Sequence, residues 1–246
     1  MKRGHWQGVT NILRFNWHFY VLAAVGIPAG VAVGYWLGGV WVAVAWAVAA
    51  LLIGSLVLGL VVSHYLYDRT GLYRLDWLDG LRLGRGERVL NIHAGFDEFS
   101  GVLSERFPNV LLAVADFYDP AVHTEVSVAR ARRAYPPFPG KVSVRTTDLP
   151  FAEDDFAAVF ICFSAHEIRN DAERVAFFRE LRRVTRPGAP VVVLEHLRDA
   201  PNALAYTFGV FHFLPRPTWL RTFTTAGWHI ADERKYTPFL TLFTLR

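Results

Sequence analysis

The sequence predicts an α/β domain with a doubly wound, mainly parallel sheet and a terminal antiparallel strand, preceded by a two-helix transmembrane hairpin. Two observations lead to this prediction. All 26 Lys and Arg residues and all 22 Asp and Glu residues lie outside residues 15–67. The rest of the chain has about the 25% charged content of an ordinary globular domain. From residue 88 onward, short apolar runs alternate with helical patterns, which is typical of βαβ units and a parallel sheet.

The predicted hairpin, within residues 1–67, consists of two apolar stretches at residues 19–37 and 40–62. Each has about the 20 residues that a helix needs to cross a hydrocarbon core. Gly38 and Gly39 separate them, so the chain returns to the side of the membrane from which it started. A cleaved signal peptide fits poorly, because the first apolar stretch is long and a second follows at once. The alternative is a soluble protein in which both stretches are core helices.

Basic residues flank the hairpin on both sides. Lys2, Arg3 and Arg14 precede the first stretch, Arg69 and Arg74 follow the second, and the turn between the stretches carries no charge. The positive-inside rule therefore predicts a multi-pass membrane protein whose N-terminus and C-terminal domain are both cytoplasmic.

Small residues recur every four positions along both stretches. They are Gly26, Gly30 and Gly34 in the first and Ser55 and Gly59 in the second. This spacing lets helices approach closely, within one chain or between copies in an oligomer. The first expected partner of the hairpin is membrane lipid.

The remaining chain predicts a connector and one domain. Residues 68–85 mix aromatic and charged side chains, as in an amphipathic connector along the inner membrane face. Within residues 86–246, we expect strands at 88–93, 110–115, 142–146, 157–163 and 190–195, and helices at 98–106, 120–135 and 171–185. Asp119 and Pro120 are a helix-capping residue and a first-turn proline. The C-terminal segment predicts a helix closing at Gly227 and two strands joined around Pro238.

Three stretches in this domain resemble the class I S-adenosylmethionine-dependent methyltransferases. They are "RVLNIHAGFDEFS", "TTDLPFAEDDFAAVFICFSAHEI" and "FFRELRRVTRPGAPVVVLEH", in the order and spacing of that family, and the resemblance covers residues 86–246. It implies a Rossmann-like sheet, S-adenosylmethionine as cofactor and methyl transfer as activity. The first motif is degenerate. Asn91 stands where the family has an acid, His93 and Asp97 replace two glycines, and Gly95 alone remains.

The resemblance also implies which residues bind the cofactor. Asn91, His93 and Gly95 would surround its methionine end. Asp116 would accept hydrogen bonds from both ribose hydroxyls, and Asp148 would contact the adenine amino group. Leu149 would lie beside the adenine ring, and Phe117 and Phe163 would supply apolar walls. The alternative is that Asp116 and Asp148 only cap turns.

Two polar residues follow the fourth and fifth predicted strands, at the sheet edge where ligands bind. His166 in "SAHEIRND" is the first choice for a base or an acceptor-positioning group, and a structural histidine bonded to backbone is the alternative. Glu195 in "LEHLRD" is the second choice. We expect no metal, because "HEIRN" lacks the second histidine of a His-Glu-x-x-His zinc helix. The single cysteine, Cys162, is interpreted as a buried thiol.

These observations predict a membrane-anchored S-adenosylmethionine-dependent methyltransferase that acts on a lipid-soluble or membrane-bound acceptor. The aromatic segment "APNALAYTFGVFHFLPRPTWL" is interpreted as a lid or membrane-dipping segment, with Tyr206 and His212 as its polar candidates. A formal charge of +4 without a Lys/Arg tract argues against nucleic acid as a partner. The alternative function is a non-catalytic membrane protein that reuses the fold for binding or assembly.

Overall fold

The computed structural model describes residues 4–246, and the chain divides into two compact units. The first contains the chain up to Thr70 together with Leu204–Thr207, and the second contains Gly71–Ala203 and Phe208–Arg246. Lys2 and Arg3, two of the predicted flanking cations, lie outside the described residues.

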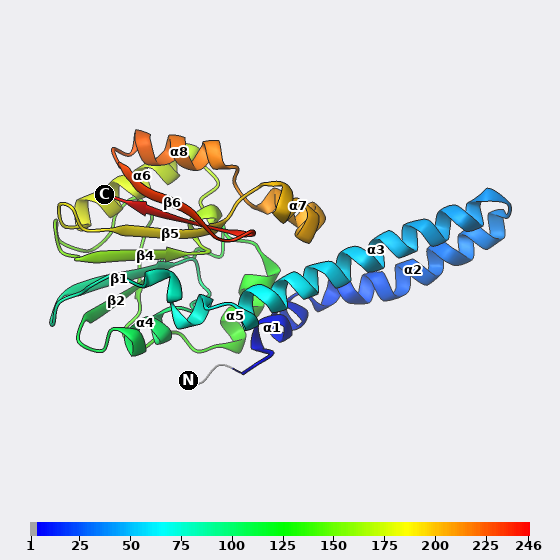
Figure 1. Ribbon diagram of the computed structural model, residues 1–246, viewed down its shortest axis with the longest axis horizontal. Coiled ribbons are helices and arrows are strands. Elements are labelled where there is room, and N and C mark those ends of the chain that lie inside the picture. The colour runs from blue at the N-terminus through cyan, green and yellow to red at the C-terminus, as the bar shows by residue number, and fades with distance from the viewer. Residues whose placement is uncertain (1–3) are drawn as a thin grey trace. The chain divides into compact units, whose positions relative to one another are not determined.

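Two long helices dominate the first unit, α2 at Trp17–Leu37 and α3 at Val40–His64, which run side by side in Figure 1. Gly38 and Gly39 join them with φ angles of +72° and +57°, a conformation that glycine adopts without strain. Only 6% of the most apolar 18-residue window in each helix is buried. By length and composition, both helices are long and apolar enough to cross a membrane.

The three glycines of α2 differ in whether they contact α3. A Cβ atom at Gly34 would lie 2.5 Å from the Cβ of Ala45 on α3, so the close approach of the two helices depends on this glycine. A Cβ at Gly26 or Gly30 would meet nothing within 4 Å. These two positions are therefore not needed for the hairpin and stay open to another helix.

A short helix that the sequence did not predict, α1 at Gln7–Phe15, precedes the hairpin. The buried carboxylate of Asp68 accepts hydrogen bonds from the backbone N–H groups of Gly8 at 2.6 Å and Val9 at 3.0 Å. Asp68 lies in a π-helical turn, η1 at Tyr65–Arg69, directly after α3. One carboxylate thus caps the start of α1 from the end of the hairpin.

The second unit is built on a seven-stranded sheet with the order β3-β2-β1-β4-β5-β7-β6 (Figure 1). The strands are β1 Arg88–His93, β2 Leu111–Asp116, β3 Val142–Ser143, β4 Ala158–Cys162, β5 Val191–His196, β6 Ile230–Thr237 and β7 Leu240–Leu245. Strands β1 to β5 are parallel, and β7 lies antiparallel between β5 and β6. The predicted doubly wound sheet with a terminal antiparallel strand is confirmed.

The helices of this unit agree with the predicted order and differ in length. They are α4 Ser100–Arg106, α5 Val126–Ala134, α6 Asp171–Val184, α7 Ala200–Tyr206 and α8 Arg216–Thr225, with short 3-10 turns η4 Ala165–Glu167 and η5 Thr207–His212. The end of α7 and the first residue of η5, Leu204–Thr207, belong to the first unit. The expected helix at 120–135 begins only at Val126. The reason is a closed turn before it, in which Asp119 Oδ1 accepts from the N–H of Ala121 and His123 Nδ1 accepts from the N–H of Asp119.

The connector differs from its prediction. Residues 72–78 form two 3-10 turns, η2 Leu72–Arg74 and η3 Asp76–Leu78, which meet at Leu75. Four apolar side chains of this segment are buried in the second unit: Leu72, Leu75, Trp77 and Leu78. The indole N–H of Trp77 donates to the carbonyl of Leu72 at 2.8 Å. From Gly71 onward the predicted connector therefore belongs to the globular unit, because its apolar side chains find burial there.

Candidate functional site

The carboxyl ends of the parallel strands form one edge of the sheet, and the predicted site residues gather there. His93 ends β1, Asp116 ends β2 and His196 ends β5, while His166 lies in η4 after β4. The strand order changes direction between β1 and β4. Ligands of doubly wound sheets bind at this kind of switch point, outside the carboxyl ends of the strands.

The loop after β1 is rebuilt around Asp97. Its Oδ1 accepts hydrogen bonds from the backbone N–H groups of Phe99 at 3.0 Å and Ser100 at 2.9 Å, and from Asn91 Nδ2 at 3.2 Å. Asn91 Nδ2 also donates to Ser100 Oγ at 2.8 Å. The acidic residue that replaces a glycine thus caps the turn into α4, and Asn91 supports the loop from within.

Position 95 in this loop requires glycine. Its φ angle is +95°, and a Cβ there would lie 2.8 Å from Tyr118 Cδ2 and 3.0 Å from Arg132 Nη1. The backbone therefore runs tightly against these side chains, and any side chain at position 95 would have to displace them.

His93 is buried beside two carboxylates. Its Nδ1 accepts from the N–H of Gly95 at 3.1 Å and lies 3.7 Å from Asp116 Oδ1, while its Nε2 lies 3.9 Å from Asp97 Oδ2. Within the described part of the chain, Nε2 has no hydrogen-bond partner. Burial lowers the pKa of His93 below its ordinary value, although Asp97 and Asp116 act in the opposite direction. The free Nε2 is the atom at this site that a polar ligand group would satisfy.

Asp116, the predicted ribose ligand, already has three donors. Its Oδ2 accepts from Arg132 Nη1 at 2.7 Å and Lys141 Nζ at 2.9 Å, and its Oδ1 accepts from the N–H of Tyr118 at 3.0 Å. Burial alone would raise the pKa of Asp116, but Arg132 and Lys141 hold it below its usual value. Arg132 also donates to the carbonyl of Gly95 at 3.1 Å. Ribose hydroxyls at this carboxylate would compete with the two cations.

The other predicted cofactor residues are more scattered. Phe117 is buried with its ring 5.4 Å from that of Phe177, and Leu149 also lies in the core. Asp148 is exposed in a turn that bridges to Arg145. Phe163 has a φ angle of +52°, rare for a residue with a side chain. It holds its ring 5.8 Å from Phe99, at the β1 loop. The roles of these residues toward a cofactor stay predictions.

His166 and Glu195, two separate candidates from the sequence, form a buried pair. His166 Nδ1 lies 2.6 Å from Glu195 Oε2, and the backbone N–H of His166 donates to Glu195 Oε1 at 3.3 Å. Burial alone would lower the pKa of His166, but Glu195 and Glu167 outweigh it and raise the pKa to about 10. His166 therefore holds a proton near neutral pH. In this state it can position a ligand or donate a hydrogen bond to it, but it cannot act as a base.

Two further residues complete this cluster. Glu167 was not chosen from the sequence, and His212 was named only as a polar candidate of the aromatic segment. Glu167 Oε1 lies 3.5 Å from His166 Nε2 and 3.1 Å from His212 Nε2. The rings of His166 and His212 are 4.9 Å apart and nearly perpendicular. His212 comes from η5, 45 residues further along the chain, so only the fold brings it to the position after β4.

His196 adds an uncharged imidazole to the same edge. Its ring stacks between those of Phe163 at 5.3 Å and Phe213 at 4.8 Å, and its Nδ1 lies 3.1 Å from Asn202 Oδ1. Burial lowers the pKa of His196 to about 4. The edge therefore holds a protonated histidine beside carboxylates and a neutral one between aromatic rings.

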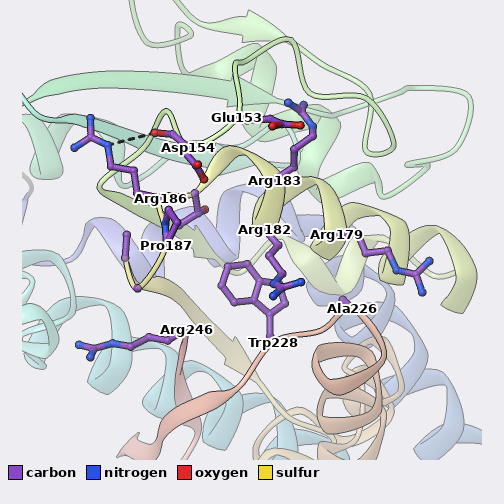
Figure 2. A pocket seen from close by; sticks show the side chains of 13 residues that line it. Glu153, Asp154, Arg179, Arg182, Arg183, Arg186, Pro187, Ala226, Trp228 and Arg246 are labelled. Carbon is purple, nitrogen blue, oxygen red and sulfur yellow. Dashed lines mark hydrogen bonds between the residues drawn. The ribbon is translucent and has the colours of Figure 1, made fainter.

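A cavity of about 530 Å³ lies away from these residues, at the opposite edge of the sheet. Figure 2 shows its lining, which includes Arg179, Arg182, Arg186, Trp228 and Arg246. Arg246 follows Leu245, which pairs with Val191, the first residue of β5. The amino ends of parallel strands are not where ligands of this fold class bind, so this cavity is separate from the site.

The binding of a cofactor through the histidine at β1 has a testable pH dependence. We expect S-adenosylmethionine, the cofactor implied by the sequence motifs, to bind more tightly as His93 becomes protonated, because an imidazolium bonds strongly to a carboxylate. Burial lowers the pKa of His93, so the rise should occur below the ordinary histidine value of about 6.5. Asp97 and Asp116 favour the protonated form, while Lys141 and Arg132 oppose it. Calorimetric titrations between pH 5 and pH 8, at about one-unit steps, measure this.

His93→Gln is the control for this prediction, since an amide side chain does not titrate. The variant should lose the increase in affinity at low pH and bind more weakly there than the wild type. An equal pH dependence in the variant would assign the titration to another group.

Comparison with known proteins gives consistent results. Residues 121–193 match a family model described as a methyltransferase domain. The demethylmenaquinone methyltransferase of Mycobacterium tuberculosis (strain ATCC 25618 / H37Rv) is 36% identical over 138 residues, 55% of this chain and 53% of that protein. The protein of the same name from Beutenbergia cavernae is 36% identical over 145 residues, 58% of this chain and 55% of that protein. The chain spans about half the length of these relatives.

Solved structures share the fold of the second unit. A SAM dependent methyltransferase from Aquifex aeolicus aligns with a TM-score of 0.51 and 16% identity, over 72% of this chain and 93% of that one. Geranyl diphosphate methyltransferase in complex with GPP and sinefungin aligns with a TM-score of 0.52 and 14% identity, over 76% of this chain and 81% of that one. At these identities the likeness concerns the fold.

Proposed function

We propose that the chain carries a class I S-adenosylmethionine-dependent methyltransferase domain, that it methylates a lipid-soluble acceptor of the quinol class, and that α2 and α3 anchor it in a membrane. S-adenosylmethionine is the cofactor that this domain implies. The proposal for the acceptor has one main support, which is that the relatives sharing 36% identity are named demethylmenaquinone methyltransferases.

The residues at the carboxyl edge fit this cofactor. Gly95 keeps the positive φ of a glycine turn after β1, and the buried Nε2 of His93 lacks a partner in the described structure. His93 would bond the polar methionine end, and Asp116 would exchange a cation for the ribose hydroxyls. When bound, the cofactor supplies an activated methyl group, so the protein mainly has to hold the acceptor in line.

The acceptor side is assigned to the segment after β4 and to η5. His166 and Glu195, predicted as the catalytic residues, would orient a hydroxyl of the acceptor, with His166 as donor in its protonated state. Phe208 and Phe211 of η5 expose 87% and 64% of their surfaces, and His212 ends the same turn. An apolar surface that leads to a polar cluster suits an acceptor with a polar ring and a hydrocarbon tail.

Membrane anchoring is supported by the length and composition of two helices. At about 1.5 Å per residue, the 21 residues of α2 and 25 of α3 suffice to cross a bilayer. With Arg14, Arg69 and Arg74 at the ends of the hairpin, we assign these ends and the catalytic unit to the cytoplasm. The open positions Gly26 and Gly30 are where a helix of a second copy would pack.

One observation favours a second function, binding or assembly without catalysis. Arg132 and Lys141 occupy the Asp116 carboxylate, and Tyr118 packs against Gly95. If these contacts are permanent, the adenosine site is closed and the fold serves as a scaffold.

The test uses the full-length chain in nanodiscs and has two stages. The protein is titrated with S-adenosylmethionine by calorimetry and is then supplied with methyl-labelled cofactor and a short-chain demethylmenaquinol. We expect binding followed by labelled quinol. Binding without transfer to this acceptor would refute the quinol assignment, and absence of binding would support the scaffold function.

A further inference from the structure

Three side chains beside the β4 carboxyl end have the geometry of a metal site. His166, Glu167 and His212 each offer one ligand atom, and these atoms all lie within 4.8 Å of one another. Glu167 Oε1 is 3.5 Å from His166 Nε2 and 3.1 Å from His212 Nε2. Ligand atoms about 2.1 Å from a tetrahedral zinc ion are about 3.4 Å apart, so these two separations are already close to those of a bound site.

A carboxylate lies near the other ring nitrogen of each histidine, and at His166 it is within hydrogen-bond distance. At His212 the guanidinium of Arg169 is nearer to that nitrogen than the carboxylate is. Glu195 Oε2 lies 2.6 Å from His166 Nδ1, and Glu125 Oε1 lies 3.4 Å from His212 Nδ1. Histidines that bind metals in proteins almost always donate their second ring N–H to such a partner, which fixes the ring and leaves the first nitrogen for the ion. Here both Nε2 atoms face the same Glu167 oxygen.

The charges of the cluster also favour a cation. Three carboxylates, Glu125, Glu167 and Glu195, surround the two imidazoles, and Glu195 is fully buried. The permanent cation beside them is Arg169, whose Nη2 lies 2.5 Å from His212 Nδ1 and 3.3 Å from its Nε2. Arg169 is exposed, so it can turn into water when an ion binds.

We propose that His166, Glu167 and His212 bind a divalent transition-metal cation, for which Zn²⁺ is the probe. Two imidazoles and one carboxylate leave a fourth position open, as in zinc sites that bind a water or a substrate oxygen. The sequence showed no zinc motif because His212 is distant in the chain. Binding of the ion does not depend on the proposed function. The ion would displace the Nε2 proton of His166. If the proposed function holds, the open position of the ion would then take the acceptor oxygen in place of the proton that His166 donates in the ion-free state, a use that rests on that function.

The experiment measures Zn²⁺ binding to the full-length, tag-free protein in detergent by calorimetry and by metal analysis after gel filtration. The wild type should retain stoichiometric Zn²⁺. Glu167→Gln and His212→Ala each remove a ligand and should abolish retention of Zn²⁺. Glu195→Gln removes the carboxylate that bonds His166 Nδ1 and should weaken Zn²⁺ affinity by about 10–100-fold. His229→Ala, at an exposed histidine outside the cluster, is the matched control and should bind as the wild type does.

Arg169→Gln distinguishes this site from a chance cluster. Removing the cation that lies against His212 should strengthen Zn²⁺ binding, whereas Arg179→Gln, at an arginine of the distant cavity, should leave it unchanged. Circular dichroism confirms that each variant is folded. No stoichiometric Zn²⁺ in the wild type at micromolar concentration, or unchanged binding in both folded ligand variants, would overturn the proposal. Because the readout needs neither cofactor nor acceptor, its failure is separate from failure of the proposed function.

Discussion

Asp116→Ala is expected to weaken binding of S-adenosylmethionine by more than about tenfold while the protein stays folded. If the ribose hydroxyls bond this carboxylate, the variant loses two charge-assisted hydrogen bonds worth roughly 1.5–3 kcal/mol each before water compensates. It also leaves Arg132 and Lys141 without the carboxylate oxygen that they share. Calorimetric titration of the full-length protein with the cofactor gives the affinity.

Two further variants make this result specific. Asp119→Ala removes a nearby carboxylate that caps the turn at Ala121 and should change cofactor affinity little. Lys141→Met removes one of the cations that compete for Asp116 Oδ2, so it should preserve or strengthen binding. Asp116→Ala that binds as tightly as the wild type would place the ribose elsewhere.

Arg174→Met is expected to cause the largest loss of stability among these variants. The guanidinium of Arg174 is fully buried and donates to the carbonyl of Ile168 at 2.8 Å and to Thr222 Oγ1 at 3.1 Å. It also pairs with the carboxylate of Asp171. Methionine fills much of the volume but leaves both buried acceptors without a donor, which costs about 1–3 kcal/mol for each group. Urea unfolding followed by tryptophan fluorescence measures the change.

Arg221→Met is the matched control, because Arg221 also bonds Asp171, at 3.2 Å, but is exposed. Its free energy of unfolding should stay close to that of the wild type, since exposed ion pairs contribute about 0–1 kcal/mol. Equal losses in the two variants would mean that the Asp171 pair, rather than the buried acceptors, is what Arg174 contributes. Because Ile168 follows η4, the loss of Arg174 should also loosen the segment that holds His166 and Glu167.

The sequence alone determined the two long helices, the order of the strands along the chain and the edge at which the site lies. The lack of charged residues between positions 15 and 67 indicated the two long helices. Five apolar runs indicated the parallel strands, because a strand that is buried on both faces of a sheet needs nearly continuous apolar residues. His93, Asp116, His166 and Glu195 were placed at one edge because each follows or ends a parallel strand. These are consequences of local pattern, which a sequence displays directly.

The tertiary structure alone decided what these residues contact. Asp97 caps α4, Arg132 and Lys141 reach Asp116 from α5 and from the loop before β3, and His212 reaches Glu167 across 45 residues. The residues of the connector were predicted to lie on a membrane face, yet Leu72 and Trp77 are buried in the globular unit. In each case the partner lies far away in the sequence or depends on a side-chain conformation. Charge pairing and burial between distant segments follow from packing in three dimensions, which residue spacing does not reveal.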